Sequence, residues 1–344
     1  MRILLLGGGV QPIPPTGYGA VERIVAELRT ALEAAGHEAV VVNRVRRRRT
    51  IDEYPFAWEL PRLLRSERFD VLHAHTPVVA NRLAGRGFPF VYTSHSRHWY
   101  YRERLSHRWG YWLERRAVRR AGAVIALTAP LARTMRSVVR PPLPPISVIP
   151  SGVDRERFRP RWELRNGRRA LGVGVVTRFK RWDVAARSLV GTGATLTLVG
   201  PIVDPVYAAE VRSVGPHVEL RGEVAPEELV RLYAESDFLL HPSEVEILSA
   251  SVIEALASGL PVVGGASVEG VVEEGSTGWS APGEGSVLAD GLRDHVRALL
   301  ADPALRRSMG EAARRSAEER FAWDRIAARH VEVYRSLPGG DRPR

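Results

Sequence analysis

The 344-residue sequence contains no cysteine and has no long hydrophobic run. Without cysteine, the chain forms no disulfide and offers no thiol nucleophile and no cysteine-ligated metal. Its apolar start, "MRILLLGGGV", is too short to span a membrane and lacks a signal-peptide cleavage pattern. We therefore expect a buried first strand at this end, and a cytoplasmic protein.

Lysine is also nearly absent. Of the 50 basic residues, 49 are arginines, and the one lysine is Lys180, within "TRFKRWD" (177–183). Chance in an arginine-rich chain is one explanation. The other is a site that needs a compact, flexible ammonium instead of a planar guanidinium, and a site for a phosphate ligand is of this kind.

Positive charge is concentrated in the first half. Residues 1–150 hold 24 basic and 11 acidic residues, a net charge of +13, whereas residues 151–344 hold 26 and 28, a net charge of −2. A basic surface suggests an anionic partner, such as nucleic acid, a phosphorylated substrate or acidic lipid headgroups. An arginine-rich composition without such a partner is the alternative.

Short apolar runs alternate with helical patterns, which is typical of parallel sheets covered by helices on both faces. The clearest helical pattern, residues 20–36, has apolar residues three and four apart and ends at a glycine. Residues 286–337 also read as helices. Strands are expected at 2–7, 39–43, 70–75, 90–94, 123–127 and 146–150, and again at 170–176, 195–200, 217–222, 237–242 and 260–265.

The proline-rich segment "RPPLPPISVIPSGVDRERFRP" (140–160) separates the two series of strands. The sequence thus predicts an α/β protein with two doubly wound, Rossmann-like domains, residues 1–150 and 151–321. A C-terminal helix at 322–338 would pack back on the first domain. Two such domains in tandem place a ligand cleft between them, at the carboxyl ends of the strands.

The first loop, "GGGVQPIPPTGYGAVER" (7–23), places Gly17 and Gly19 before a helix whose free N–H groups can receive an anion. Its spacing is neither that of the dinucleotide fingerprint nor that of a P-loop. A tight turn explains these glycines equally well.

The segment "HPSEVEILSASVIEALASGLPVV" (241–263) places Glu246 and Glu254 on either side of a helix start expected near Ser249. A helix start offers amides and a positive dipole end to phosphate. Two carboxylates beside a phosphate site suit a sugar nucleotide, because each can hold the hydroxyls of one sugar. Arg178 and Lys180 follow another strand of this domain, where two cations would neutralise a diphosphate leaving group.

With these segments the chain resembles the retaining glycosyltransferases of family four, which have the two-domain GT-B fold. The resemblance covers nearly the whole chain. It rests on the Glu-x7-Glu pair, the linker "VIPSGVDRERFRP" (148–160), the glycine loop (14–28), the segment 218–243 and the late loop "VVEEGSTGWSAPG" (271–283). It implies transfer of a sugar from a UDP- or GDP-linked donor to an acceptor hydroxyl, the first domain serving the acceptor and the second the donor.

The resemblance also implies residue roles. Glu246 would hold donor-sugar hydroxyls and Glu254 the ribose, Arg178 and Lys180 would bind the diphosphate, and His95, in "VYTSHS", would lie near the donor sugar. The leaving phosphate would take the acceptor's proton, so Glu246 is not a covalent nucleophile. Further donor-binding roles are implied for Gly17, Gly19, Gly200, Arg221, Leu248 and Ser249, and weaker ones for His75 and Arg181.

Three positions depart from the family pattern. Ile247 and Ser249 stand where the family commonly has glycines after the first glutamate, and Ala20 replaces another glycine. A branched residue does not easily adopt the positive φ that glycine allows, so we expect a different donor-sugar loop. The sequence has no Asp-x-Asp motif and no histidine–carboxylate cluster with metal spacing. We therefore expect no metal requirement and no bound cofactor.

Residues 97–120 interleave three tryptophans and three tyrosines with arginines, and we expect them to form a helix suited to a membrane interface. Together with "RVRRRR" (44–49) they predict peripheral contact with anionic lipid at the inner face of the membrane, and a sugar, lipid-linked or small hydroxyl acceptor. An ordinary basic helix without lipid contact is the alternative.

Two other functions remain open at this point. A nucleic-acid-binding protein would fit the basic first half, but the sequence contains no recognisable nucleic-acid module, so we expect no such partner. A phosphorylase or an epimerase would use the same fold for a different reaction.

Overall fold

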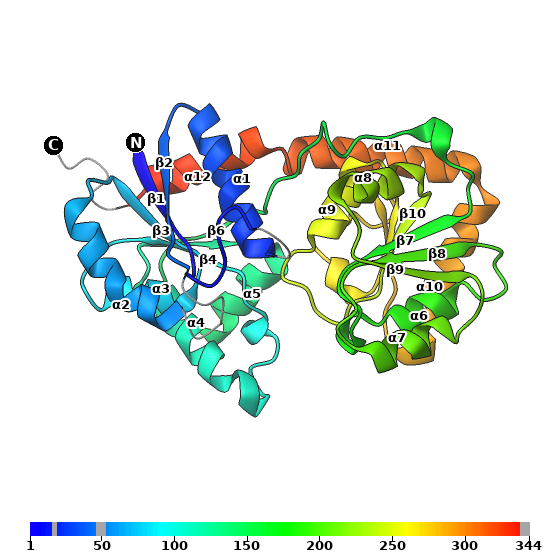
Figure 1. Ribbon diagram of the computed structural model, residues 1–344, viewed down its shortest axis with the longest axis horizontal. Helices are drawn as coiled ribbons and strands as arrows, with labels where there is room; N and C mark the ends of the chain where they lie inside the picture. Colours follow the sequence, from blue (N-terminus) through cyan, green and yellow to red (C-terminus); the bar gives the residue numbers. More distant parts are fainter. Residues whose placement is uncertain (16–18, 46–52, 338–344) are drawn as a thin grey trace. The chain divides into compact units, whose positions relative to one another are not determined.

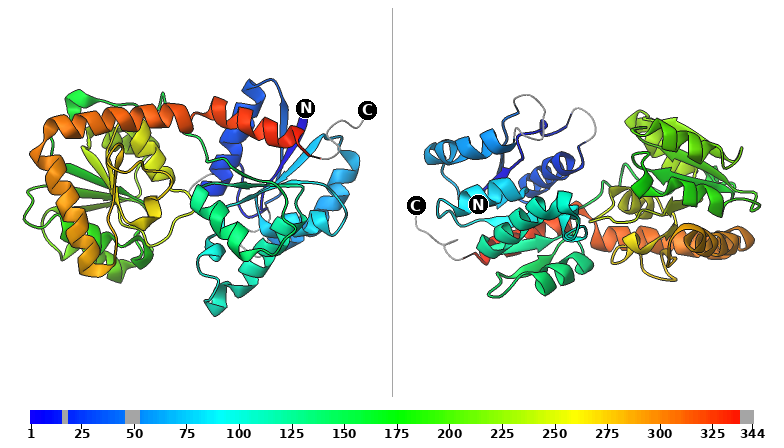
Figure 2. Two further views of the ribbon diagram at one scale, coloured as in Figure 1. Left: turned by 180° about the vertical axis from the view of Figure 1, so that it is seen from behind. Right: turned by 90° about the horizontal axis from the view of Figure 1, so that it is seen from below.

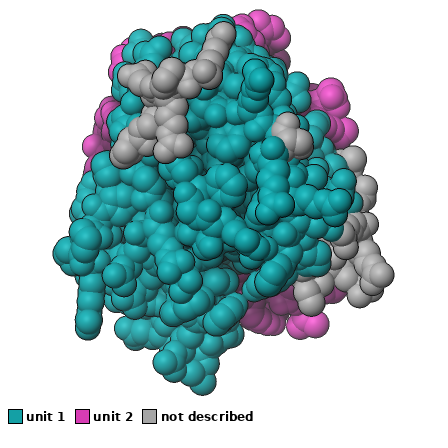
Figure 3. All heavy atoms as spheres, turned by 90° about the vertical axis from the view of Figure 1, so that its left-hand side faces the viewer, with its two compact units in different colours: residues 1–152, 323–344 teal, residues 153–322 magenta. Residues whose placement is uncertain are grey.

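The computed structural model describes residues 1–15, 19–45 and 53–337. The chain divides into two compact units, residues 1–152 with 323–344 (unit 1) and residues 153–322 (unit 2), which Figure 3 draws in different colours. Each unit contains one six-stranded sheet, and all its strand pairs are parallel. The prediction of two doubly wound α/β sheets is confirmed.

Unit 1 has the strand order β2-β1-β3-β4-β5-β6 (Figure 1). Its strands are β1 (Arg2–Leu6), β2 (Glu38–Val42), β3 (Val71–Ala74), β4 (Val91–Ser94), β5 (Ala123–Ala126) and β6 (Ile146–Val148). Its helices are α1 (Ala20–Ala34), α2 (Glu53–Leu63), α3 (Pro77–Ala84), α4 (Arg108–Arg120), α5 (Ala129–Val138) and α12 (Trp323–Arg335).

Unit 2 has the strand order β12-β11-β10-β7-β8-β9. Its strands are β7 (Arg169–Val173), β8 (Thr195–Val199), β9 (Val218–Gly222), β10 (Phe238–His241), β11 (Val262–Gly264) and β12 (Gly278–Ser280). Its helices are α6 (Trp182–Ser188), α7 (Pro205–Arg212), α8 (Pro226–Glu235), α9 (Ala250–Ala257), α10 (Gly285–Ala301) and α11 (Pro303–Arg320).

The central strands are buried on both faces because helices cover both sides of each sheet. In β10, Leu239 and Leu240 are consecutive and fully buried, yet they belong to different core clusters. Successive side chains of a strand point to opposite faces, so one leucine packs toward α8, α9 and α11 and the other toward α6, α7 and α10. This accounts for continuous apolar runs instead of polar–apolar alternation.

The C-terminal helix α12 is part of unit 1. Figures 1 and 2 show it in red beside α1, and its Ile326, Val331 and Tyr334 share a core cluster with Val25 and Leu28 of α1. Burying an apolar side chain of this size stabilises the fold by about 1.5–3 kcal/mol. The last helix therefore contributes to the core of the first unit.

The structure corrects one expected element and adds another. Residues 97–120 are not one helix: two 3-10 turns, Arg97–Trp99 and Leu105–His107, precede α4. The fully buried Trp99 donates its indole N–H to Ser94 Oγ at 2.9 Å, which holds the first turn against the end of β4. The added strand is β12, whose three residues are too short to give a sequence pattern.

Candidate functional site

In unit 2 the strand order reverses between β7 and β10. Strands β8 and β9 lie on one side of β7, and β10, β11 and β12 lie on the other. In doubly wound sheets, ligands bind outside the carboxyl ends of the strands at such a reversal. Lys180 follows β7 and Glu246 follows β10, so both lie in the segments that border this point.

Lys180 and Glu246 form a buried ion pair. The Nζ atom of Lys180 donates to Oε1 of Glu246 at 2.5 Å, and their side chains are 11% and 15% exposed. Burial alone would raise the pKa of Glu246, but Lys180 and His241 more than offset it, and the pKa lies below its ordinary value. The site thus holds a carboxylate and an ammonium close together in a largely dehydrated place.

Local backbone geometry positions the lysine. It ends the 3-10 turn Arg178–Lys180, and the next residue, Arg181, adopts a left-handed φ of 55° before α6 begins. Gly174, at φ 150°, leaves room for the side chain: a Cβ there would lie 3.2 Å from Cε and Nζ of Lys180. The lysine therefore occupies a narrow space beside bare backbone.

His241, the last residue of β10, is the third member of this group. It is fully buried, and its Nε2 atom lies 3.7 Å from Oε1 of Glu246. Neither ring nitrogen has a hydrogen-bond partner within the described part of the chain. Burial, and next the charge of Lys180, lower the pKa of His241 to about 4, so the imidazole is neutral at pH 7.

Glu254 lies in a different environment. Helix α9 begins at Ala250 with Ser249 at the N-cap, as the sequence predicted, and Glu254 lies in its second turn. The residue is buried, and Tyr233 of α8 donates its hydroxyl to Glu254 Oε2 at 2.9 Å. Ser249 Oγ lies 2.9 Å from Ser251 Oγ. The two glutamates thus occupy opposite sides of the start of α9.

Ile247 and Leu248, between the glutamates, pack toward the protein interior. Ile247 is 7% exposed, and Leu248 packs against the core cluster of α8, α9 and α11. Apolar side chains therefore anchor this loop to the core of unit 2.

The three arginines assigned to the donor site bind carboxylates elsewhere on the same unit. Arg178 makes two hydrogen bonds to Glu210, of 2.9 and 2.6 Å, and this partner raises its pKa. Arg181 donates to Glu284 at 2.8 Å. Arg221 donates to Glu219 of β9 and to Glu228 of α8, both at 2.9 Å. Lys180, in contrast to these three arginines, donates its hydrogen bond to a glutamate of the predicted site, Glu246.

The predicted glycines have separate structural reasons. Gly200 has a φ of 142°, and a Cβ there would lie 2.2 Å from the carbonyl oxygen of Gly174, so close backbone packing requires it. Gly19 is the N-cap of α1, where a Cβ would meet Pro15 at 2.8 Å. Gly17 lies outside the described residues, as do four of the arginines of the 44–49 run.

In unit 1, His75 and His95 follow the adjacent strands β3 and β4. His75 Nδ1 lies 3.2 Å from His95 Nε2. Burial lowers the pKa of both, that of His95 to about 4. His73 stacks next to them, 4.1 Å from His75 between ring centroids, and its Nδ1 lies 2.8 Å from the Tyr334 hydroxyl of α12. The two predicted histidines therefore belong to a larger buried cluster.

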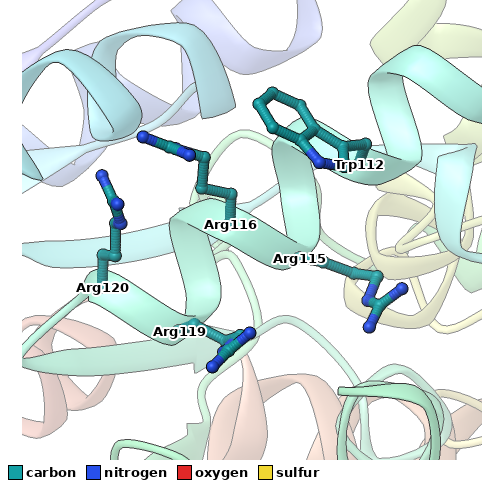
Figure 4. Close-up of a pocket in the computed structure, with 5 residues that line it drawn as sticks. All are labelled: Trp112, Arg115, Arg116, Arg119 and Arg120. Atoms are coloured by element: carbon teal, nitrogen blue, oxygen red, sulfur yellow. The ribbon is translucent and has the colours of Figure 1, made fainter. Parts of the chain in front are cut away.

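Helix α4 carries an exposed basic face. Figure 4 shows its arginines around a surface pocket of about 380 Å³. The residues that line this pocket are Trp112, Arg115, Arg116, Arg119 and Arg120. No ion pair joins these arginines to a carboxylate among the residues the structure describes.

The one acidic residue of α4 does not neutralise that face. Glu114 is fully buried and accepts hydrogen bonds from the hydroxyls of Tyr92 and Ser94, at 2.8 and 2.9 Å. Burial raises the pKa of Glu114 to about 7. The charged side chains that α4 leaves fully or partly exposed are therefore all cationic, and the exposed Trp109 and Trp112 stack at 4.9 Å among them.

Two family models match the sequence. Residues 19–157 match the model described as Glycosyltransferase Family 4, and residues 191–316 match the model described as Glycosyl transferases group 1. The chain belongs to family 4 of the glycosyltransferases. It is a retaining enzyme of the hexosyltransferase type, and a retaining glycosyltransferase is what the sequence predicted.

Individual relatives are similar to this glycosyltransferase over nearly its whole length. Glycogen synthase of Mycobacterium tuberculosis is 29% identical over 411 residues, covering 99% of this chain and 96% of that protein. Sucrose-phosphate synthase from Thermosynechococcus elongatus superposes with a TM-score of 0.82 at 21% identity and covers 98% of both chains. The HepE protein of Anabaena, solved with UDP-glucose, superposes with a TM-score of 0.76 at 19% identity, covering 98% and 100%. The structural likenesses establish the GT-B fold.

Sequence reasoning missed His241 and Gly174 in this glycosyltransferase. A signal for His241 existed, because it ends a predicted strand, a placement like the one that drew attention to His75 and His95. Gly174 gave no signal, because its φ and its distance from Lys180 depend on the folded chain. Within the described residues no group of three or more histidine, aspartate or glutamate side chains is arranged so that it could hold a metal ion, and none of the described helices has both the length and the apolar character that a membrane span needs.

Proposed function

We propose that this glycosyltransferase binds a nucleotide diphosphate sugar at the carboxyl ends of β7 and β10 and transfers its sugar to an acceptor at an anionic surface. The observation that carries the proposal is the buried Lys180–Glu246 pair at the reversal of strand order in unit 2. A cation there suits a diphosphate, and a carboxylate beside it suits the hydroxyls of a sugar.

Each residue has one task in the transfer. Lys180 binds the oxygens of the diphosphate, Glu246 orients the donor sugar, and Glu254 accepts the ribose hydroxyls while Tyr233 fixes its carboxylate. The bond between the anomeric carbon and the phosphate oxygen breaks, and its electron pair stays on the phosphate. The acceptor oxygen bonds to the same face of the anomeric carbon, and its proton passes to the leaving phosphate.

Lys180 acts on the step in which charge develops. As the phosphate leaves, its bridging oxygen becomes more negative, and a fixed cation stabilises that charge more strongly than it stabilises the bound donor. Burial keeps His95 of unit 1 neutral, so its imidazole can accept or donate a hydrogen bond without adding charge. We assign these roles as part of the proposal.

UDP is the favoured nucleotide, with GDP as the alternative. The support is the likeness in fold to the Anabaena protein solved with UDP-glucose. A thermal-shift screen with UDP-glucose, GDP-mannose and their free nucleotides tests the choice, because a ligand that binds only the native state raises Tm with its saturation. We expect the largest increase with a UDP-linked sugar. Equal, negligible shifts with every nucleotide would contradict the donor site.

A matched pair of variants tests whether the Tm increase with UDP-glucose arises from binding at the proposed donor site. Glu254→Ala should lose most of the increase that UDP-glucose produces, whereas Glu227→Ala, on the exposed face of α8, should keep it. An equal shift in both variants would show that the nucleotide binds elsewhere.

The basic face of α4 supports an acceptor, such as a lipid-linked sugar, at the inner face of a membrane. Within the described part of the chain no ion pair joins these four arginines to a carboxylate, and two exposed tryptophans lie beside them; aromatic and arginine side chains are suited to a lipid interface. Each basic residue near an anionic membrane contributes about 1 kcal/mol of attraction.

Vesicle co-sedimentation tests the membrane proposal. The chain should sediment with vesicles containing phosphatidylglycerol, not with vesicles of phosphatidylcholine alone, and salt should release it. Replacing Arg115, Arg116, Arg119 and Arg120 with glutamine should abolish sedimentation. A control with the same loss of charge, at the exposed Arg212, Arg231, Arg297 and Arg307 of unit 2, should retain it. Equal sedimentation of the two variants would refute the assignment of this surface.

A further inference from the structure

His241 is a buried titratable group to which the proposed transfer gives no task. The residue is 0% exposed, and within the described chain neither Nδ1 nor Nε2 has a hydrogen-bond partner. A buried polar side chain is almost always hydrogen-bonded, and an orphaned one marks strain, a catalytic role or a partner that arrives later. The site around His241 distinguishes these explanations.

One oxygen atom brings the three side chains together. Oε1 of Glu246 accepts the hydrogen bond of Lys180 Nζ at 2.5 Å and lies 3.7 Å from His241 Nε2. At 3.7 Å, the Nε2 atom lies about half an ångström beyond the usual hydrogen-bond distance of about 2.7–3.2 Å. Lys180 holds the carboxylate that His241 would otherwise bind.

The backbone decides which partner can move. His241 belongs to β10 and pairs in register with Gly264 of β11, and its backbone carbonyl oxygen accepts a hydrogen bond from Gly265 N at 3.1 Å. Glu246 lies in the irregular segment between β10 and α9, and Lys180 ends a short 3-10 turn. The sheet therefore holds the backbone of His241, whose ring is fully buried, whereas the two charged side chains extend from a loop and a short turn.

We propose that His241 is a positioning residue that takes over the carboxylate of Glu246 when a donor diphosphate draws Lys180 away. This rests on the proposed function, in which Lys180 binds the diphosphate. Without a second partner, Glu246 would then be a buried carboxylate with its cation gone, which is strongly unfavourable. His241 supplies that partner and keeps Glu246 aimed at the donor sugar.

This exchange of Lys180 for His241 at the Glu246 carboxylate links donor binding to the uptake of a proton. The charged groups that act on His241 are Lys180, which lowers its pKa, and Glu246, which raises it. When Lys180 moves to the diphosphate, its repulsion weakens and Glu246 loses its first partner, so the pKa of His241 rises from about 4. Donor binding should therefore take up a proton, and affinity should increase as the pH falls from neutral toward that pKa.

Calorimetric titration with UDP-glucose measures the proton directly. UDP-glucose is the right probe because its diphosphate is esterified at both ends and has no group that titrates near neutral pH. Titrations at about pH 6 in buffers of different ionisation enthalpy give the number of protons bound per donor. We expect a clear fraction of a proton in the wild type, more at about pH 6 than at about pH 7.5.

Two substitutions separate positioning from a structural role. His241→Gln keeps an N–H donor close to the Nε2 position but does not titrate, so it should bind UDP-glucose nearly as well as the wild type and take up no proton. His241→Leu removes the donor and should weaken binding roughly tenfold, the equivalent of about one charge-assisted hydrogen bond. Tm values without ligand show whether each variant is folded.

A double-mutant cycle with Glu246→Gln identifies the partner. If His241 acts through Glu246, His241→Leu should have no further effect on the Kd for UDP-glucose once the carboxylate is gone. Proton uptake that persists in His241→Gln, or effects of the two changes that simply add, would overturn the proposal. Failure of the wild type to bind UDP-glucose or GDP-mannose would instead contradict the proposed donor site, a separate outcome.

Discussion

Replacing Lys180 with arginine asks whether the single lysine of the sequence reflects geometry or chance. Its ammonium donates to Glu246 at 2.5 Å and occupies the space that a side chain at Gly174 would fill, 3.2 Å away. A guanidinium is wider than an ammonium and needs room for a planar fork. The structure offers little room, because the Lys180 side chain is only 11% exposed.

The magnitude follows from the charge that Lys180 meets in the transition state. Losing a fixed charged contact to a leaving group costs on the order of 3 kcal/mol, or roughly a hundredfold in rate. We expect Lys180→Ala to lower kcat by about that factor and to change KM less, because the contact strengthens as the phosphate leaves. Lys180→Arg should restore part of the loss.

Initial rates of UDP release over a series of UDP-glucose concentrations give kcat and KM for each variant. Arg212→Ala, which removes an exposed cation from the same unit, is the control and should behave as wild type. Full activity of Lys180→Arg would refute the geometric explanation and leave the lysine as an accident of composition. Unchanged kcat in Lys180→Ala would refute its role altogether.

Lys180→Ala should also lower the stability of the protein. Removing one partner of a buried ion pair typically costs about 3–5 kcal/mol. Because the pKa of Glu246 is depressed in the folded state, its contribution is present above its ordinary pKa of 4.5 and is lost as the pH falls through the folded value. The Tm deficit of Lys180→Ala should therefore be largest near neutral pH and should shrink in acid.

Three other outcomes follow from the structure. Glu246→Gln should chiefly lower kcat for UDP release, whereas Glu254→Ala should chiefly weaken donor binding; wild-type kinetics in both would remove the site assignment. Excess EDTA should leave UDP release unchanged, and activity that returns only with added Mg²⁺ or Mn²⁺ would contradict this. Burial lowers the pKa of His95 and of His330 from 6.5 to about 4 in the folded protein. The stability that the neutral histidines provide should therefore be fully present above pH 6.5 and should decline as the pH falls from 6.5 toward 4. Tm measurements across this pH range test this, and His330→Gln should make the decline smaller.

Much of the fold could be predicted because apolar runs and turn residues are local signals. The eleven expected strands are present, and the start of α9 lies where the sequence placed it. The missing strand, β12, has three residues, and its pairing with β11 depends on contacts distant in sequence. The expected helix at 97–120 begins only at Arg108, because the burial of Trp99 outweighs helical periodicity.

The site was less predictable than the fold. Sequence could place Lys180 and Glu246 at neighbouring strand ends, but not the 2.5 Å bond between them, which depends on the left-handed turn at Arg181 and the space at Gly174. Arg178 carries the charge expected of a diphosphate ligand, yet Glu210, 32 residues away, binds it in the structure. Partners distant in sequence determine where a long cationic side chain points.

A crystal structure with UDP-glucose shows whether the donor binds at the Lys180–Glu246 pair. The diphosphate should lie within hydrogen-bonding distance of Lys180 Nζ, the glucose hydroxyls at Glu246 and the ribose at Glu254. The Lys180–Glu246 hydrogen bond should be broken, and His241 Nε2 should lie closer than 3.7 Å to the Glu246 carboxylate. A nucleotide bound away from the carboxyl ends of β7 and β10, with the ion pair intact, would contradict this donor site.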